Sequence, residues 1–120
     1  MIIQAIRWKR AEDERLSVLK NGAIARVVVA KRPLIFVRVD SVLRALLDIC
    51  PHQGRSFEGG WCDEGYIVCP FHRMHFDPVT GENKFGATSR VQVFPVEERD
   101  SAVYVGIPYS TISLFGRKLW

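Results

Sequence analysis

The chain has 120 residues, of which 48% are apolar and 25% charged, and its formal net charge is +4. A chain of this size can bury a core of its own, so these values indicate one globular domain and exclude intrinsic disorder and low-complexity sequence. Lysine and arginine are scattered along the sequence. The positive charge therefore indicates a solvated surface, or a bias that steers an acidic partner, and does not indicate nucleic-acid binding.

The sequence also argues against export and membrane insertion. Arg7, Lys9 and Arg10 interrupt the N-terminal stretch too early for a signal peptide. No apolar run approaches the roughly 20 residues that a membrane helix needs. The chain has three cysteines, an odd number, so a closed set of disulfides is not expected. We therefore expect no membrane association and a reducing, cytoplasmic location.

Strand signals dominate the first part of the chain. Short runs rich in β-branched and apolar residues alternate with turn residues, a pattern typical of all-β sandwiches and barrels. Asn21-Gly22 is a strong turn signal after the second run. The runs over 34–39 and 42–49 are apolar enough to lie inside a sandwich or barrel. Strands are expected over residues 2–8, 16–20, 25–31, 34–39 and 42–49, with a single helical turn over 12–19 as an alternative.

The segment between about residues 49 and 87 has a different composition. Six glycines and three prolines interrupt it from Cys50 to Gly86, so only short strands over 66–69 and 75–77 fit. Strands resume over 91–96 and 102–107, and the apolar tail over 108–120 is expected to pack on the sandwich or to contact a partner. The prediction is one domain over residues 1–120, an all-β sandwich or barrel with a loop-rich subdomain inserted at 49–87.

Two pairs of metal-binding residue types lie in this loop-rich segment. Residues 50–52 read C-P-H and residues 69–72 read C-P-F-H, with sixteen residues between the two pairs. Each pair offers one thiolate and one imidazole, and a local pair loses less chain entropy on binding a metal than two distant residues do. A metal site built from two loops is therefore predicted, with the ligands Cys50, His52, Cys69 and His72.

Other readings of these residues stay open at this point. The same four ligands also suit zinc, although zinc motifs usually separate their ligands by two or more residues, and C-x-H is tighter. Visible absorbance separates the two, because zinc is colourless. Cys62 lies between the pairs and is expected to be a small packing residue. His75 is expected to be a surface or packing histidine, and its exchange for His72 as a ligand is the alternative.

Together with its flanks, the pattern resembles the Rieske family. Residues 50–54 match C-P-H-x-G, residues 69–72 match C-P-aromatic-H, and residues 76–81 match F-D-x-x-T-G. Residues 94–96, F-P-V, are similar to the family's C-terminal strand, so the resemblance extends over about residues 24–107. One departure is Arg73, which stands where family members usually have a glycine that permits positive φ.

The resemblance implies a Rieske-like fold and one [2Fe–2S] cluster. Two cysteines bind one iron of such a centre and two histidines bind the other. Carried over by motif position, Cys50 and Cys69 would hold the buried iron, and His52 and His72 the outer iron. The family's histidine side faces solvent and passes the electron to a partner. Its rim, which suits an acidic docking patch, would here be formed by Gln53, Arg55, Phe71 and Arg73.

The resemblance also implies a low reduction potential. Rieske proteins of cytochrome bc complexes have a disulfide between the two loops and two hydroxyls that donate hydrogen bonds to the cluster. The matching positions here are Arg55 and Phe71 for the disulfide, and Met74 and Phe76 for the hydroxyls. Without those donors the negative charge of the reduced cluster is less well stabilised. We therefore expect a potential at the low end of the Rieske range, about −150 mV.

The implied function is one-electron transfer by a ferredoxin of an oxygenase system, with a ferredoxin reductase and a terminal oxygenase as partners. The chain is not expected to be an enzyme itself. It has no G-x-G-x-x-G loop for a dinucleotide, and only His75 remains for a 2-His-1-carboxylate iron site. The alternative is a small Rieske subunit, or an N-terminal Rieske fragment, of a larger oxidoreductase or oxygenase. A binding module without redox chemistry is a third reading, which a colourless protein would favour.

Overall fold

The computed structural model describes residues 2–51, 54–71, 73–86, 89–114 and 117–118, and the side chains within 5–109 of these ranges. These residues form strands and turns without a helix, so the all-β prediction is confirmed. Within the same ranges, no helix has the length and apolar character needed to cross a membrane.

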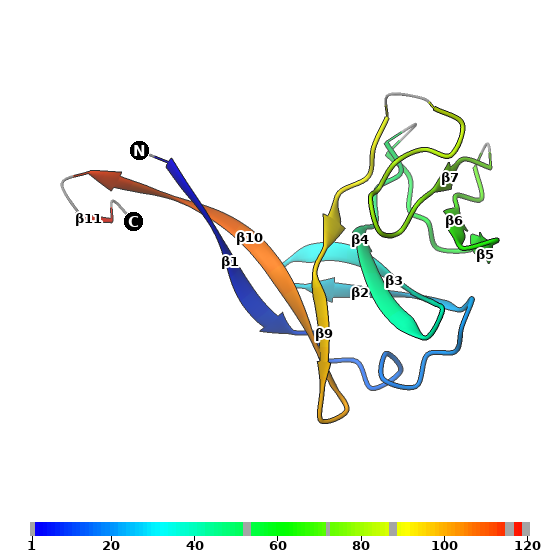
Figure 1. Cartoon of the computed structure of the whole chain (residues 1–120), viewed down its shortest axis with the longest axis horizontal. Helices are drawn as coiled ribbons and strands as arrows, with labels where there is room; N and C mark the ends of the chain where they lie inside the picture. Colours follow the sequence, from blue (N-terminus) through cyan, green and yellow to red (C-terminus); the bar gives the residue numbers. More distant parts are fainter. Residues whose placement is uncertain (1, 52–53, 72, 87–88, 115–116, 119–120) are drawn as a thin grey trace.

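The strands form three antiparallel sheets. Figure 1 shows the two larger sheets side by side, and the small third sheet at the end of the molecule that carries the loop-rich segment. The first sheet contains β1 (Ile2–Arg10), β9 (Val96–Arg99), β10 (Ala102–Leu114) and β11 (Arg117–Lys118). The second contains β2 (Ile24–Val29), β3 (Arg32–Val39), β4 (Val42–Leu47) and β8 (Val93–Phe94). The third contains β5 (Trp61–Asp63), β6 (Tyr66–Val68) and β7 (His75–Phe76).

Strand β3 is buried on both faces, as the apolar run over 34–39 predicts. Successive side chains of a strand point to opposite faces, so Leu34 and Phe36 contribute to one apolar cluster and Ile35 and Val37 to another. We call these clusters the first core and the second core. The first core also takes Val103, Val105 and Ile107 of β10 and therefore lies between the two larger sheets. The second core lies on the other face of β3, where it includes Cys50, Phe57, Ile67, Cys69 and Phe76.

The strand expected over residues 16–20 is not formed. Leu16 donates its N–H to the Asp13 carbonyl and Leu19 donates to the Leu16 carbonyl, which makes successive turns. Leu16 is fully buried in the first core from this turn. The Arg38 guanidinium donates to the carbonyls of Leu16 and Leu19, at 3.0 and 2.5 Å. One arginine therefore satisfies backbone acceptors that a partner strand would otherwise pair, and the alternative of a single helical turn is closer to the structure.

The tail does not pack on the sandwich as expected over residues 108–114. Strand β10 continues through this segment and pairs with β1, from Pro108 opposite Ile6 to Ile112 opposite Ile2. Figure 1 shows the resulting two-stranded ribbon of the first sheet projecting away from the second and third sheets. Gly106 permits the close packing at its base, because a Cβ there would lie 2.6 Å from the Pro95 ring and 2.8 Å from Ile6. Backbone pairing across the ribbon thus decides the path of the tail.

Candidate metal centre

Two loops carry the predicted ligands. The first ligand loop, residues 50–57, follows β4, and the Cys50 N–H donates to the Arg55 carbonyl at 2.7 Å. The Gly54 N–H in turn donates to the Cys50 carbonyl at 2.7 Å, and Gly54 has a φ of +69° that suits glycine. The second ligand loop, residues 69–74, joins β6 to β7 and is closed by the Cys69 N–H donating to the Met74 carbonyl at 2.9 Å. The described residues of both loops are therefore held by defined backbone hydrogen bonds.

The two loops bring Cys50 and Cys69 together in the second core. Both cysteines are free, with exposed fractions of 2% and 0%, and their side chains are within hydrogen-bonding reach of each other. The Phe71 backbone N–H lies close enough to the Cys69 sulfur to favour negative charge on it, because it lowers the pKa of this thiol. Two adjacent buried sulfurs from separate loops, one of them beside a backbone N–H, are a donor set that fits the inner iron of a Rieske centre.

The environment of Cys69 favours its neutral thiol. Burial raises the pKa of Cys69 to about 11, the nearby Cys50 and Asp48 add to the rise, and the Phe71 N–H partly opposes it. Such a thiol keeps its proton at neutral pH unless a metal ion takes the proton's place, because a thiolate is the form that binds metal. Loading this pocket with metal would therefore release protons.

His52 and His72 lie outside the described residues. Within the part of the chain that the structure describes, no group of three or more histidine, cysteine, aspartate or glutamate side chains is placed to hold a metal ion. The structure therefore brings together the two predicted sulfur ligands, and ligation by all four residues stays a prediction.

The other residues considered from the sequence have ordinary packing roles. Cys62 is half-buried on β5 and packs against the second core, as expected. His75 packs edge-on against Tyr66 and Phe85. Its Nδ1 lies 2.9 Å from the Arg73 carbonyl oxygen and its Nε2 lies 3.3 Å from a carboxylate oxygen of Asp63. Both ring nitrogens thus have polar partners, which confirms a packing histidine and argues against its exchange for His72.

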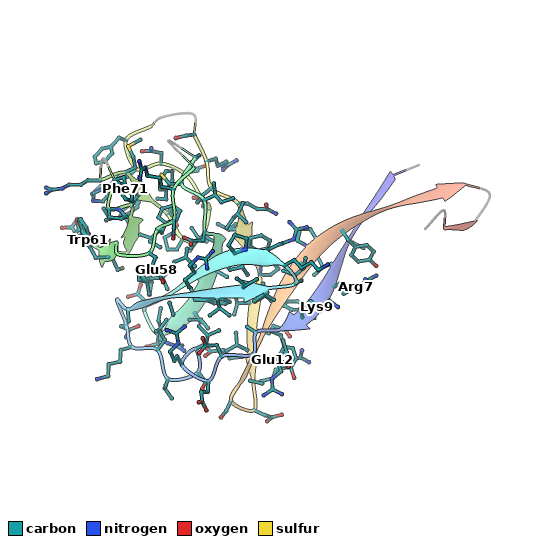
Figure 2. All side chains as sticks on the ribbon, turned by 180° about the vertical axis from the view of Figure 1, so that it is seen from behind. Arg7, Lys9, Glu12, Glu58, Trp61 and Phe71 are labelled. Atoms are coloured by element: carbon teal, nitrogen blue, oxygen red, sulfur yellow. The ribbon has the colours of Figure 1, made fainter. Side chains whose placement is uncertain are left out.

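Two arginines lie at the surface of the ligand loops, and one of them departs from the family pattern. Arg73 adopts the left-handed conformation, with a φ of +51°, where the family usually has glycine. The Arg55 guanidinium lies 4.3 Å above the centre of the Phe71 ring, so a cation–π contact joins the first loop to the second. Figure 2 shows Phe71 and Trp61 at the opposite end of the molecule from Arg7 and Lys9.

The sequence reading missed Asp48. Its side chain is fully buried just after β4, where it accepts hydrogen bonds from Arg26, Ser56 and the Phe57 backbone. The available signal was the position of this acidic residue, which follows an apolar strand and precedes a predicted ligand by two residues. Its partners lie eight or more residues away in sequence, so the signal pointed to no particular contact.

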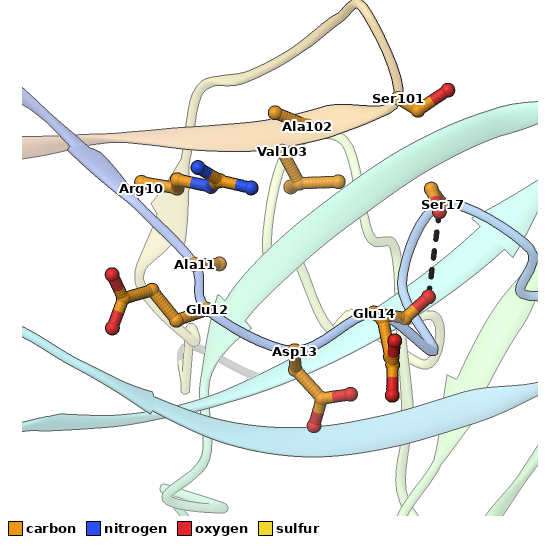
Figure 3. A pocket seen from close by; sticks show the side chains of 9 residues that line it. All are labelled: Arg10, Ala11, Glu12, Asp13, Glu14, Ser17, Ser101, Ala102 and Val103. Atoms are coloured by element: carbon orange, nitrogen blue, oxygen red, sulfur yellow. Dashed lines mark hydrogen bonds between the residues drawn. The ribbon is translucent and has the colours of Figure 1, made fainter.

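A separate cavity of about 550 Å³ lies away from the ligand loops. Figure 3 shows its lining, which comes from the end of β1, the loop after it and the start of β10. The charged side chains there are Arg10, Glu12, Asp13 and Glu14, without a cysteine or histidine. This cavity therefore offers none of the sulfur or imidazole ligands of the predicted metal site.

A model of the Rieske [2Fe-2S] domain matches residues 10–95. That range is more than half of the chain, so the chain belongs to the Rieske [2Fe-2S] domain family, whose members bind one Rieske-type cluster. The resemblance read from the two loops and their flanks is confirmed.

Similar proteins include both small ferredoxins and longer oxygenase components. Ferredoxin CarAc of Metapseudomonas resinovorans is 36% identical over 91 residues, which cover 74% of this chain and 85% of the ferredoxin. The oxygenase component of dicamba O-demethylase from Stenotrophomonas maltophilia is 30% identical over 94 residues, and the chain spans only 28% of its length. A chain in the solved complex of reduced oxygenase and oxidized ferredoxin in carbazole 1,9a-dioxygenase matches with a TM-score of 0.66 and 32% identity. That match covers 86% of this chain and 99% of the other.

Proposed function

We propose that this chain is a one-electron carrier, the ferredoxin component of an oxygenase system, with one Rieske [2Fe–2S] cluster. The observation that carries the proposal is the pair of buried cysteines, Cys50 and Cys69, which two separate loops of a Rieske domain place within hydrogen-bonding reach. The extent of the match supports a ferredoxin, because it covers 85% of ferredoxin CarAc. We also propose that residues 1–120 form a single domain and that the protein works in the cytoplasm, where its thiols stay reduced.

In this proposal the cysteines and the histidines bind different irons of the cluster. Cys50 and Cys69 hold the inner iron as thiolates, and His52 and His72 hold the outer iron through their imidazoles. When bound, the cluster supplies a centre that accepts one electron and passes one on. The Phe71 N–H stabilises negative charge on the Cys69 sulfur, and the buried apolar side chains of the second core exclude water from the cysteine side.

The surface of the ligand loops suits an acidic redox partner. Arg55 and Arg73 are exposed there, and Phe71, which is 42% exposed and lies under the Arg55 guanidinium, offers an apolar contact. Exposed positive charges raise the rate of association with an acidic surface, and salt screens that attraction. A rate of electron transfer to the partner that falls as ionic strength rises is expected, and a rate independent of ionic strength would count against this docking surface.

The reduction potential is proposed to be low, about −150 mV, because Met74 and Phe76 stand at the two positions where Rieske proteins of cytochrome bc complexes have hydroxyl donors. Phe76 is fully buried, with its ring centre 5.7 Å from that of Phe57, and Met74 packs against the second core. Neither side chain can donate a hydrogen bond to a sulfur. A clearly positive potential in a redox titration would contradict this part of the proposal.

The decisive test is spectroscopy of the purified chain. The expected result is a coloured protein with two iron atoms per chain that takes up one electron and then gives an EPR spectrum with the low average g-value of a Rieske centre. A colourless protein that contains zinc, or no metal, would reject the electron-carrier function. Reconstitution with a ferredoxin reductase and an oxygenase then tests the place in an oxygenase system, with electron delivery per turnover as the readout.

A second candidate is a Rieske subunit or fragment of a larger oxidoreductase or oxygenase. The observation that favours it is the match to the oxygenase component of dicamba O-demethylase, of which the chain covers 28%. Co-purification with a larger catalytic chain, and loss of stability when that chain is removed, would favour this candidate. A stable protein that exchanges electrons rapidly with a reductase on its own would favour the ferredoxin.

A further inference from the structure

Asp48 is the only charged residue that is buried among the described side chains. It follows β4 and precedes Cys50 by two residues, and the exposed fraction of its side chain is 0%. One carboxylate oxygen accepts the Phe57 N–H at 2.7 Å. The other accepts the Ser56 hydroxyl at 2.5 Å and the Arg26 guanidinium at 2.8 Å. A buried carboxylate with three donors is well satisfied, so it persists in the folded protein at low cost.

These contacts join both ends of the first ligand loop to the body of the protein. The Asp48 N–H donates to the Pro33 carbonyl of β3 at 2.8 Å, which anchors the start of the loop. The Asp48 carboxylate anchors the end of the loop through Ser56 and Phe57. Cys50 lies between the two anchors, so the position of its sulfur depends on them.

The two charges of the Asp48–Arg26 pair differ in their contact with water. The Arg26 side chain is 38% exposed, whereas the carboxylate has no contact with solvent. Water screens the exposed positive charge more strongly than the buried negative charge. A net negative field therefore remains at the buried end of the pair, beside the cysteine pocket.

We propose that Asp48 is a positioning residue that sets the first ligand loop and, through its buried charge, lowers the reduction potential of the cluster. The inference rests on the proposed function as an electron carrier. Reduction adds one negative charge to the cluster, and a nearby negative charge opposes that addition. Arg26 and Ser56 complete this arrangement. Arg26 supplies the opposite charge, and the neutral Ser56 hydroxyl links the carboxylate to the loop.

Variants of the holoprotein separate the charge of Asp48 from its hydrogen bonds. Asp48→Asn removes the negative charge but keeps an oxygen that can accept the Phe57 N–H, and its potential is expected to rise. Ser56→Ala loosens the loop and keeps the charge, so its potential is not expected to rise. Glu98→Gln is the matched control: it removes a carboxylate paired with Arg38 whose side chain is 36% exposed, and its potential should stay at the wild-type value.

Arg26→Met is expected to shift the reduction potential in the opposite direction from Asp48→Asn. It leaves the Asp48 charge without its partner, so the potential is expected to fall. An unchanged or lower potential in Asp48→Asn with the cluster intact would overturn the inference, as would an equal rise in Ser56→Ala. If Asp48→Asn fails to retain the cluster, Arg26→Met decides: a fall supports the inference and an unchanged potential overturns it.

Hydrogen–deuterium exchange tests the positioning role independently of the redox signal. Asp48→Asn and Ser56→Ala are expected to speed exchange in peptides covering residues 54–60 and to leave those covering β4 unchanged. Unchanged exchange over 54–60 in both variants would overturn the positioning role. The wild-type protein separates the two proposals: without a Rieske EPR signal the proposed function fails, whereas a wild-type signal with unmoved variant potentials rejects only the role of Asp48.

Discussion

The first and second cores lie on the two faces of β3 and differ in the residues that form them. The first core consists of apolar side chains, mostly from the long strands of the two larger sheets. The second core includes two cysteines, a buried phenylalanine from a ligand loop and residues of a sheet whose strands have two or three residues. Hydrophobic burial alone can therefore hold the first core, whereas the second also depends on loop hydrogen bonds and, in the proposed function, on the cluster that its cysteines would bind. The protein thus combines a stable frame, the first core, with the proposed cluster site on the two faces of one strand.

The comparison predicts the largest effect from Cys69→Ala. Because the substitution removes one of two buried sulfurs, complete loss of visible absorbance and of the EPR signal is expected. The first core contains neither Cys50 nor Cys69, so the strand signal in far-UV circular dichroism should persist. Cys62→Ala is the control and should keep full absorbance, because Cys62 lies half-buried at the edge of the second core. Loss of all strand signal in Cys69→Ala would show that the first core does not stay folded when the second core is disrupted.

Phe36→Ala tests how much the first core contributes to the stability of the protein. Phe36 is fully buried in the first core on β3, and deleting a buried phenyl ring costs about 3–5 kcal/mol of the free energy of unfolding. Chemical denaturation followed by circular dichroism measures the loss. Val28→Thr, at a position that is 56% exposed on β2, should change stability by less than about 0.5 kcal/mol. A cost below about 1 kcal/mol for Phe36→Ala would contradict the assignment of the frame to the first core.

Arg73→Gly tests strain in the second ligand loop. Arg73 has a φ of +51°, which costs a side-chain-bearing residue about 1–2 kcal/mol. Glycine removes that cost but adds chain entropy in the unfolded state, so a net gain below about 1 kcal/mol is expected. The midpoint of cluster loss in denaturant should therefore rise. Arg73→Lys keeps the same backbone strain and should leave the midpoint unchanged; a lower midpoint for the glycine variant would mean that the Arg73 side chain stabilises the loop.

The smallest effect is expected at the contact between the two loops. Arg55→Met removes an exposed cation–π contact with Phe71, which is worth about 0.5–1 kcal/mol. The midpoint of cluster loss should fall by a correspondingly small amount, and the ionic-strength dependence of electron transfer to the partner should weaken. Arg55→Lys keeps the positive charge and should preserve that dependence. An Arg55→Met effect on the midpoint as large as that of Phe36→Ala on unfolding would mean that this surface contact governs the loops.

Local patterns were sufficient for the class of fold and for the family. Strand runs with turn residues between them indicated an all-β protein, and burial of β3 on both faces followed from its apolar composition. The two short C-x-H and C-x-x-H motifs identified the family and predicted Cys50 and Cys69 as ligands, because ligands held a few residues apart leave a signature in the sequence. The same patterns predicted a strand over residues 16–20, where turns form, and a tail packed on the sandwich, where β10 instead pairs with β1.

Contacts between distant segments were beyond any local pattern. Strand β10 pairs with β1 across most of the chain length, Arg38 replaces a partner strand for the carbonyls of Leu16 and Leu19, and Asp48 collects donors from β2 and from the end of a loop. Each arrangement satisfies buried backbone or carboxylate groups with partners that only folding brings near. Composition and short motifs record what one segment can do locally. They do not record which distant donor will meet a buried acceptor. The donors from Arg26, Ser56 and Phe57 are what allow the Asp48 carboxylate to stay buried near Cys50.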